Sequence, residues 1–508
     1  MLPFHHVGKQ IGADGVRFRW PLIVAGVLAL LARAQGIATP MYSVDGWGGW
    51  DPGDYPLFFE EGRFGFVLAQ WLLRRVGYAG MDVVPSALVL STVLLIGAGF
   101  VYARVLFDKP DAIEVFVFTS LFALHPFNTE FYTFSDVTLI IMLAIFLAAV
   151  GLACANAGSR TWIGPAVGGL LLVLSASIYQ TAFVDSAVVS LLCLVGRIPA
   201  SGAATTGLRL PLRYASIPQV RAFLGLTAAA LAYVACTFAS RPLLGFTLSD
   251  RFANALGAGV SNRLQILVAS VRYALKPPSG IVPGLASAIL VAVLLVAAAA
   301  IVRALLRRGV AHFVLGVFSL LASGAFAVSL CAVEQFAGLT PRELSPFSIW
   351  VAGVAALGWH SVRTEAVRYG LGFALAVLLL SFVGSSNRIL YDQRRVNSWD
   401  RQQANRILTR LEADPHFRDI HALALVNGDR RYGAELSTVV GDMNSSAFAI
   451  EWSKLPMMEQ TTGLRFGGPT DAEAEYARTY CRAASVWPSG ESAVVHDGLA
   501  IICLPKPR

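Results

Sequence analysis

Acidic and aromatic side chains that could do chemistry are concentrated in one polar stretch near the start of the chain. A first apolar segment is followed directly by Tyr42-Ser43-Val44-Asp45-Gly46-Trp47, and the charged residues that come next are Asp51, Asp54, Glu60, Glu61 and Arg63. A carboxylate can take a proton from a hydroxyl group, and an arginine can hold a phosphate. The stretch therefore predicts a polar site beside a membrane, facing a lipid-borne substrate.

Two further polar turns lie between apolar segments. The first contains His125-Pro126-Phe127 followed by Glu130, and the second contains Tyr179-Gln180. An acid at membrane depth is costly and is usually retained for a role, which singles out Glu130. The neighbouring phenylalanines fit an interfacial aromatic belt equally well, and polar groups near Gln180 could simply hydrogen-bond one helix to another. Tyr179-Gln180 at the depth of Glu130 indicates a shared cavity.

Composition identifies a protein that crosses a membrane several times. The chain has 508 residues, of which 56% are hydrophobic and only 14% charged, and its mean hydropathy is +0.61. A soluble domain cannot bury that much apolar surface. The net charge of +8 comes from Lys and Arg in short clusters between apolar segments, which indicates loop anchors rather than nucleic-acid binding. The predicted fold class is an all-α polytopic membrane bundle with a small C-terminal α/β domain.

The apolar segments predict about eleven transmembrane helices, several of them shorter than the roughly 20 residues that cross a bilayer unaided. Their ranges are 20–37, 83–105, 112–124, 137–155, 162–178, 182–195, 222–239, 282–302, 312–332, 347–360 and 369–383. Basic residues occupy alternate connections, so these connections are predicted to be cytoplasmic, with the N-terminus inside. The other loops and the tail after Gly384 then face outward. Ala32-Arg33-Ala34 resembles a signal-peptide cleavage site, but Arg33 and the topology favour an uncleaved anchor.

The predicted domains are a transmembrane domain, 1–384, and a soluble extracytoplasmic domain, 385–508. The tail pattern predicts a helix at 399–411, a strand at 421–426, a helix at 471–484 and a hairpin at 494–502 around Asp497-Gly498. Cys481 and Cys503 are the only cysteines in this tail, and an oxidising compartment would make them a disulfide. The cysteine and histidine spacings predict no metal site, and there is no nucleotide-binding fingerprint.

Outward-side cations could hold a phosphate. The candidates are Arg63, Arg241, Arg272, Lys276 and Arg342. Snorkelling to the interface explains Arg241 and Lys276 equally well, and Arg342 could pair with Glu334. Arg63 precedes an amphipathic pattern that predicts a helix lying on the outer leaflet.

In their order and common outward placement, these motifs resemble the GtrII-like O-antigen glucosyltransferases, which are GT-C-type membrane enzymes that use a polyprenyl-phosphate sugar. The matching residues are Tyr42-Ser43-Val44-Asp45, Glu61-Gly62-Arg63-Phe64, His125-Pro126-Phe127 with Glu130, and Ile178-Tyr179-Gln180. The resemblance covers the chain to about Gly196 by motif and the remainder by layout. The family commonly has two adjacent acids where this chain has Asp45-Gly46, so the second carboxylate comes from Asp51, from Asp54 or from neither.

The resemblance implies transfer of a sugar, glucose in this family, from polyprenyl phosphate to a surface glycan such as the O-antigen of lipopolysaccharide. The site would face the outside of the bacterial inner membrane, and the C-terminal domain would be periplasmic. Asp45 is the first candidate base, with Glu60, Glu61 and Glu130 as rivals. The substrate-binding candidates are Arg63, Asp51, Asp54, His125, Tyr179, Gln180, Arg272 and Arg342.

A flippase or transporter of lipid-linked glycans is the alternative from another class. It would need charges near the middle of spans, whereas Glu114 and Asp185 are predicted close to span ends, which favours an enzyme. An O-antigen polymerase usually centres on a large outward loop that this chain lacks in mid-sequence. Expected partners are membrane lipids, a polyprenyl-phosphate glucosyl synthase and a flippase, and not nucleic acid. The sequence leaves open the identity of the sugar and any need for a divalent cation.

Overall fold

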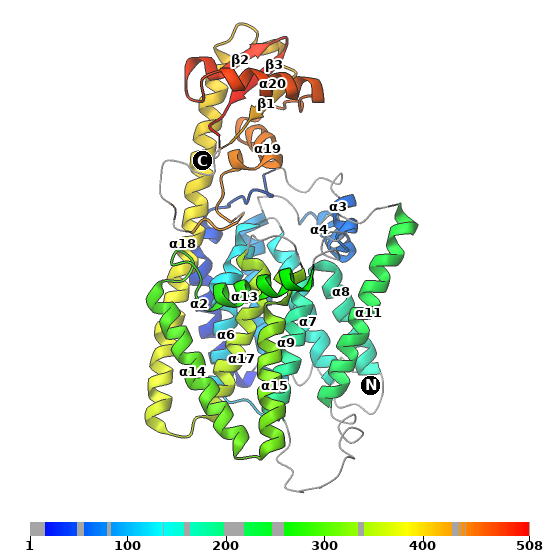
Figure 1. Ribbon diagram of the computed structural model, residues 1–508, viewed down its shortest axis with the longest axis vertical. Coiled ribbons are helices and arrows are strands. Elements are labelled where there is room, and N and C mark those ends of the chain that lie inside the picture. The colour runs from blue at the N-terminus through cyan, green and yellow to red at the C-terminus, as the bar shows by residue number, and fades with distance from the viewer. Residues whose placement is uncertain are drawn as a thin grey trace.

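The computed structural model describes residues 16–47, 55–78, 83–135, 137–156, 163–197, 218–245, 259–333, 340–428, 436, 438–441 and 443–506. The chain is mostly helical and has two parts. A bundle of long helices carries a small domain with a sheet at one end, and α18 runs from the bundle into that domain (Figure 1). The prediction of an α-helical bundle with a small C-terminal α/β domain is therefore confirmed at this level.

Every apolar segment predicted from the sequence lies in helical structure. The helices are α2 (Arg19–Ala38), α5 (Val84–Leu106), α6 (Ala112–Leu124), α7 (Thr138–Asn156), α8 (Ile163–Ile178), α9 (Gln180–Arg197), α11 (Pro218–Leu244), α14 (Gly284–Leu306), α15 (Val310–Ala327) with the short α16 (Ser329–Val333), α17 (Ser345–Ser361) and α18 (Glu365–Glu412). Within the described ranges, seven helices are long and apolar enough to cross a membrane. Three others, α6, α8 and α9, are shorter apolar helices.

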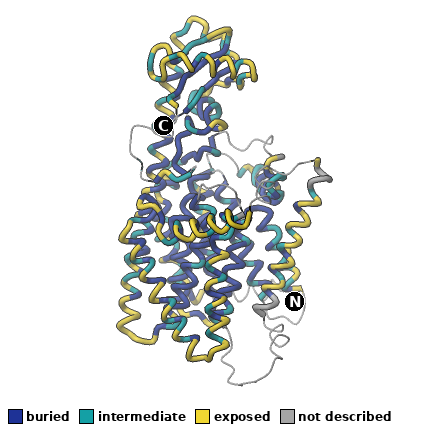
Figure 2. Tube along the Cα trace, viewed as in Figure 1, coloured by how far each residue is buried: buried dark blue, intermediate teal, exposed yellow. Residues whose placement is uncertain are grey.

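The bundle is packed tightly inside and is apolar outside. A Cβ atom added to Gly168 on α8 would lie 2.5 Å from the carbonyl oxygen of Gly151 on α7, so these two helices approach as closely as small residues allow. On the outer surface, Leu170, Leu295 and Phe318 are each more than 60% exposed, and exposed turns follow the outside of the bundle in Figure 2. An apolar exterior of this kind is suited to contact with lipid.

The two ends of the bundle differ in character. The end next to the C-terminal domain carries α3 (Tyr55–Glu60), α4 (Phe64–Arg75) and α13 (Val260–Leu275), and α13 lies across the bundle (Figure 1). The opposite end holds the α14–α15 and α17–α18 connections (Figure 1), which contain Arg307, Arg308 and Arg363. Cationic connections and the elements predicted to carry the site therefore lie at opposite ends.

Helix α18 changes the predicted domain boundary. The sequence predicts a division between Gly384 and Ser385 and a separate helix at 399–411, but one helix runs from Glu365 to Glu412. The reason is local, because 385–411 contains neither glycine nor proline, and a single interior glycine costs a helix only about 1 kcal/mol. The soluble part is therefore joined to the bundle by a continuous helix rather than by a linker.

The C-terminal domain is built on a three-stranded sheet. Its strands are β1 (Ala422–Val426), β2 (Ala493–His496) and β3 (Leu499–Cys503), in the order β1-β3-β2, with β1 parallel and β2 antiparallel to β3. The predicted hairpin turns at Asp497 and Gly498, both with positive φ, as a two-residue turn requires. A disulfide joins Cys481 on α20 (Asp471–Ala483) to Cys503 on β3, which is the predicted pairing. Helix α19 (Glu451–Thr462) was not predicted.

Asp400 makes a pH-dependent contribution to the stability of this junction. Its carboxylate lies on α18 beyond the bundle and accepts hydrogen bonds from Ser446 Oγ at 2.5 Å and from the Ala447 backbone N–H at 2.9 Å. Burial raises the pKa of Asp400 from 3.8 to about 7. Because the folded pKa lies above the unfolded value, the folded state binds more protons between these two values. Stability from this group is therefore highest below about pH 4 and falls until the pH passes about 7.

Replacing Asp400 with asparagine is expected to flatten this part of the pH dependence. Asparagine can accept the Ala447 hydrogen bond and donate to Ser446, but it has no charge to bury. The variant should gain up to about 4 kcal/mol over the original chain at pH 8 and little at pH 4. Thermal unfolding of the full chain in detergent across this range measures the difference. Parallel pH profiles for the two chains would contradict the assignment.

Candidate functional site

Glu130 lies in a buried turn at the end of α6. Pro126 disfavours helical backbone at the preceding residue, so α6 ends at His125 and the chain continues as the 3-10 helix η3 (Pro126–Thr133), whose residues are all buried. Glu130 itself is 0% exposed. A carboxylate so far from water needs strong partners.

Arg342 provides those partners from a distant part of the chain. Its backbone N–H donates to Glu130 Oε2 at 2.6 Å, and its Nη1 donates to Oε1 at 3.0 Å. Arg342 lies on η4 (Pro341–Leu344), and its guanidinium carbon is also 4.8 Å from the centre of the Phe134 ring. The pair therefore joins η3 to η4 with charge-assisted hydrogen bonds at a position where 20% of the arginine side chain stays exposed.

Tyr179 and Arg63 complete this cluster. Tyr179 lies between α8 and α9, with its ring edge-on to Phe131 at 5.5 Å, and the Arg63 guanidinium carbon is 5.4 Å from the Tyr179 ring. Arg342, Arg63 and Glu130 are all near enough to the Tyr179 hydroxyl to interact with it electrostatically. The structure thus brings together four of the residues predicted from sequence, with one arginine on each of two elements around a tyrosine.

The turn between α3 and α4 holds Arg63 in place. Glu61 pairs with Arg63 Nε at 3.3 Å, and Gln180 Nε2 donates to the Glu61 carbonyl oxygen and to the Tyr233 hydroxyl, each at 3.0 Å. Gly62 has a φ of +75°, and a Cβ there would lie 2.7 Å from the Tyr233 hydroxyl. Only glycine fits this turn without strain. The predicted amphipathic helix after Arg63 is α4, which exposes Leu68, Trp71 and Leu72.

Asp45 lies elsewhere, at the junction between the bundle and the C-terminal domain. Trp452 Nε1 on α19 donates to Asp45 Oδ1 at 2.8 Å, and the Tyr42 backbone N–H donates to Asn397 on α18 at 2.8 Å. By contrast, η3 contacts α18 through the 2.8 Å hydrogen bond between Thr129 and Ser386. These two anchor points are eleven residues apart on α18, about 16 Å at 1.5 Å per residue. The structure therefore does not bring Asp45 to Glu130.

The aromatic residues next to Asp45 pack against the C-terminal domain and hold this segment away from Glu130. Tyr42 and Trp47 stack with ring centres 4.5 Å apart and belong to the core of the C-terminal domain. The acids that follow, Asp51 and Asp54, lie outside the described residues, as do Glu334 and the side chain of Arg241.

His125 lies in the core of the bundle and has a structural role. It is buried among the rings of Phe127, Phe347 and Phe382, and its Nδ1 accepts the Phe127 backbone N–H at 3.3 Å. The imidazole therefore caps the start of η3 from within the core, and does not line the surface shared by Tyr179 and Arg342.

Arg33 is a buried cation that sequence reasoning did not assign to the site. It lies on α2 with its guanidinium carbon 4.4 Å from the Tyr132 ring centre, and its Nη2 donates to the Ala123 carbonyl oxygen at 3.0 Å. It thus supports η3 from the bundle interior. The available signal was an arginine inside an apolar span, which is costly unless it has partners.

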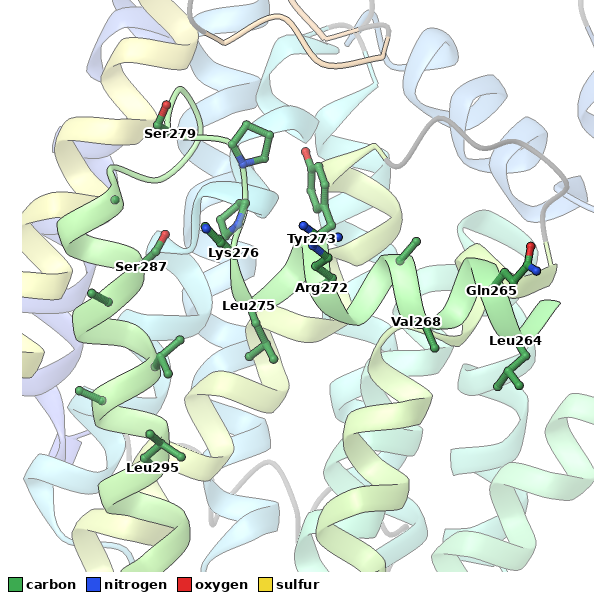
Figure 3. Close-up of a pocket in the computed structure, with 17 residues that line it drawn as sticks. Leu264, Gln265, Val268, Arg272, Tyr273, Leu275, Lys276, Ser279, Ser287 and Leu295 are labelled. Carbon is green, nitrogen blue, oxygen red and sulfur yellow. The ribbon is translucent and has the colours of Figure 1, made fainter. Parts of the chain in front are cut away.

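A large groove adjoins the cluster at the same end of the bundle. It lies between α13 and α14, has a volume of about 1400 Å³ and is lined by Arg272, Tyr273 and Lys276 among mostly apolar residues (Figure 3). The Tyr273 ring is 6.0 Å from that of Phe127, and its hydroxyl is near enough to Glu130 to interact electrostatically. Tyr273, which the sequence did not single out, therefore borders both the groove and the Glu130 cluster.

In the part of the chain that the structure describes, no group of three or more His, Cys, Asp or Glu residues is arranged to hold a metal ion. Comparisons of the chain with models of protein families, with curated proteins and with solved structures give no match. The arrangement itself offers a buried carboxylate, two arginines and a tyrosine beside an apolar groove.

Proposed function

We propose that this chain is a membrane glycosyltransferase that moves a sugar, by resemblance glucose, from a polyprenyl phosphate to a surface glycan such as O-antigen. The observation that supports this most directly is the Glu130–Arg342 pair beside Tyr179 and Arg63. This cluster has a buried carboxylate and two arginines, a residue type suited to phosphate, near a groove open to the outside of the bundle. A lipid-linked sugar needs all three features.

In this proposal, about eleven helices cross the bacterial inner membrane. The basic connections face the cytoplasm together with the N-terminus, and the C-terminal domain is periplasmic. The Cys481–Cys503 disulfide suits that oxidising compartment. A polyprenyl-phosphate glucosyl synthase and a flippase would supply the donor to the outward face.

Glu130 replaces Asp45 as the proposed base, because Asp45 is bonded to Trp452 away from the arginines. The acceptor hydroxyl attacks the anomeric carbon, Glu130 takes the hydroxyl proton, and the bond from that carbon to the phosphate oxygen breaks. Arg342 and Arg63 stabilise the departing polyprenyl phosphate.

Transfer by the purified full chain in proteoliposomes tests the proposal. The vesicles are supplied with polyprenyl phosphate carrying radiolabelled glucose and with O-antigen acceptor, and the label in the glycan is measured. The expected result is label in the polysaccharide, confirmed by a mass increase of one hexose. Movement of the labelled lipid across the bilayer without sugar transfer would instead identify a flippase. The absence of both sugar transfer and lipid movement would also contradict the proposed enzyme.

A further inference from the structure

We propose that the groove between α13 and α14 is the seat of the polyprenyl phosphate itself. Arg272 and Lys276 would hold the phosphate when the donor lipid first docks, before the phosphate reaches Arg342 and Arg63 for transfer, and the apolar wall of α14 would hold the isoprenoid chain. This inference rests on the proposed function, and it assigns the donor lipid to a defined part of the molecule.

The polar end of the groove has unused hydrogen-bond donors. Arg272 and Lys276 lie one helical turn apart at the end of α13, and both line the cavity (Figure 3). Among the described residues, neither side chain has an ion-pair or hydrogen-bond partner. Ser287 on α14 lines the same cavity and is only 7% exposed, yet its hydroxyl also has no hydrogen-bond partner. A phosphate presents the acceptor oxygens that these three groups lack.

Snorkelling of the two cations to a membrane interface would explain their exposure. It does not explain Ser287, which lines the same groove and whose hydroxyl is buried without a hydrogen-bond partner. A buried polar group without a partner costs free energy, so the observation favours a ligand with acceptor atoms at this end of the groove.

The remainder of the groove is mostly apolar. Its walls are formed by Leu264, Val268 and Leu275 on α13 and by Val291, Ala292 and Leu295 on α14. Leu264, Val268 and Leu295 are largely exposed, and the cavity of about 1400 Å³ is far larger than a free phosphate needs. The groove has cationic side chains at one end and apolar side chains along the rest. This arrangement matches a lipid phosphate with a single hydrocarbon chain.

The position of Tyr273 connects this seat to the chemistry. Its ring centre lies 6.0 Å from that of Phe127, which belongs to the same 3-10 helix, η3, as Glu130. A sugar attached to a phosphate at Arg272 and Lys276 would therefore extend past Tyr273 toward Glu130. The tail would remain on the lipid-facing side of α14.

Native mass spectrometry of the full chain in detergent tests the seat. Undecaprenyl phosphate is the probe, and undecaprenol, phosphatidylglycerol and inorganic phosphate are compared with it. The double variant Arg272→Ala with Lys276→Ala should weaken binding of undecaprenyl phosphate at least about tenfold, because two charge-assisted contacts are lost. Ala292→Trp, which fills the apolar part, should weaken it similarly. Arg303→Ala, at the other end of α14, should leave it unchanged.

The outcomes separate the seat from the enzyme. Unchanged binding in both groove variants, with melting temperatures close to that of the original chain, would overturn the seat. Equal binding of phosphatidylglycerol or displacement by inorganic phosphate at similar concentrations would also overturn it. Normal sugar transfer by the double variant would contradict the seat in the groove but not the proposed glycosyltransferase activity. Binding that depends on Arg272 and Lys276 in a chain that transfers no sugar would support the seat and contradict the proposed activity.

Discussion

Replacing Glu130 with glutamine is expected to lower sugar transfer by about 10²- to 10⁴-fold, the range that a positioned general base contributes. Glutamine has nearly the same shape and can still accept a hydrogen bond from Arg342, but it cannot take a proton from the acceptor hydroxyl. Transfer of labelled glucose to the glycan measures the loss. A melting temperature within a few degrees of the original chain would show that the bundle still folds.

Asp45→Asn is the matched comparison, because the sequence pointed first to Asp45 and the structure bonds it to Trp452. This variant makes the same chemical change at the junction with the C-terminal domain. It should retain most of the transfer activity. Loss of transfer in Asp45→Asn together with full activity in Glu130→Gln would reverse the assignment of the base.

Replacing Arg342 with alanine is expected to be the most destabilising change at the site. It removes the guanidinium that pairs with the buried Glu130 carboxylate, and breaking a buried pair in this way costs about 3–5 kcal/mol. The 20% exposure of the Arg342 side chain favours the lower end of this range, since water can reach the position. Thermal unfolding of the full chain in detergent measures the loss.

The double variant Glu130→Gln with Arg342→Gln separates the structural and chemical roles of the pair. It removes both charges, so much of the stability lost in Arg342→Ala should return. Transfer should not return, because neither the base nor the phosphate-binding group is present. A double variant that is stable and also active would mean that the pair only joins η3 to η4. An Arg342→Ala chain as stable as the original would contradict the buried pair itself.

The site combines buried and exposed charges. Glu130 is fully buried but contacts an arginine that reaches the surface, and Arg63 lies at the start of a helix on the outer part of the bundle. Within α6, Glu114 is in the first turn, where it takes part in a capping box with Asp111 and contacts His360. Those contacts give Glu114 a local structural role at the start of α6.

Much of the fold could be predicted from the sequence, since it depends on local patterns. Apolar runs of sufficient length become helices wherever they lie, and the β-prone runs around Asp497-Gly498 form the hairpin that their turn residues require. The two cysteines of the tail had only each other as partners outside the apolar segments. The separate helix predicted at 399–411 is instead part of α18, because a change in hydropathy does not end a helix.

The candidate site was predicted only in part. Glu130, Tyr179 and Arg63 were selected from the sequence, and a cavity shared by Tyr179 and Glu130 was expected from their common depth, but the contacts of these residues with one another and with Arg342 were not predicted. Glu130 and Arg342 are 212 residues apart, and nothing in the local sequence pairs them. Asp45 was predicted to belong to the site but lies outside it. Its neighbours Tyr42 and Trp47 are buried in the core of the C-terminal domain, more than 350 residues later in the chain.

The sequence by itself thus determined which segments are apolar helices, which turns carry acids and cations, and which cysteines could pair, because each follows from residue type and short-range spacing. Only the tertiary structure decided that Arg342 neutralises Glu130, that Tyr273 borders both the groove and the acid, and that Asp45 faces α19. The physical reason is that a buried charge takes whichever partner helix packing brings within hydrogen-bonding distance. That packing depends on the shapes of all the helices together.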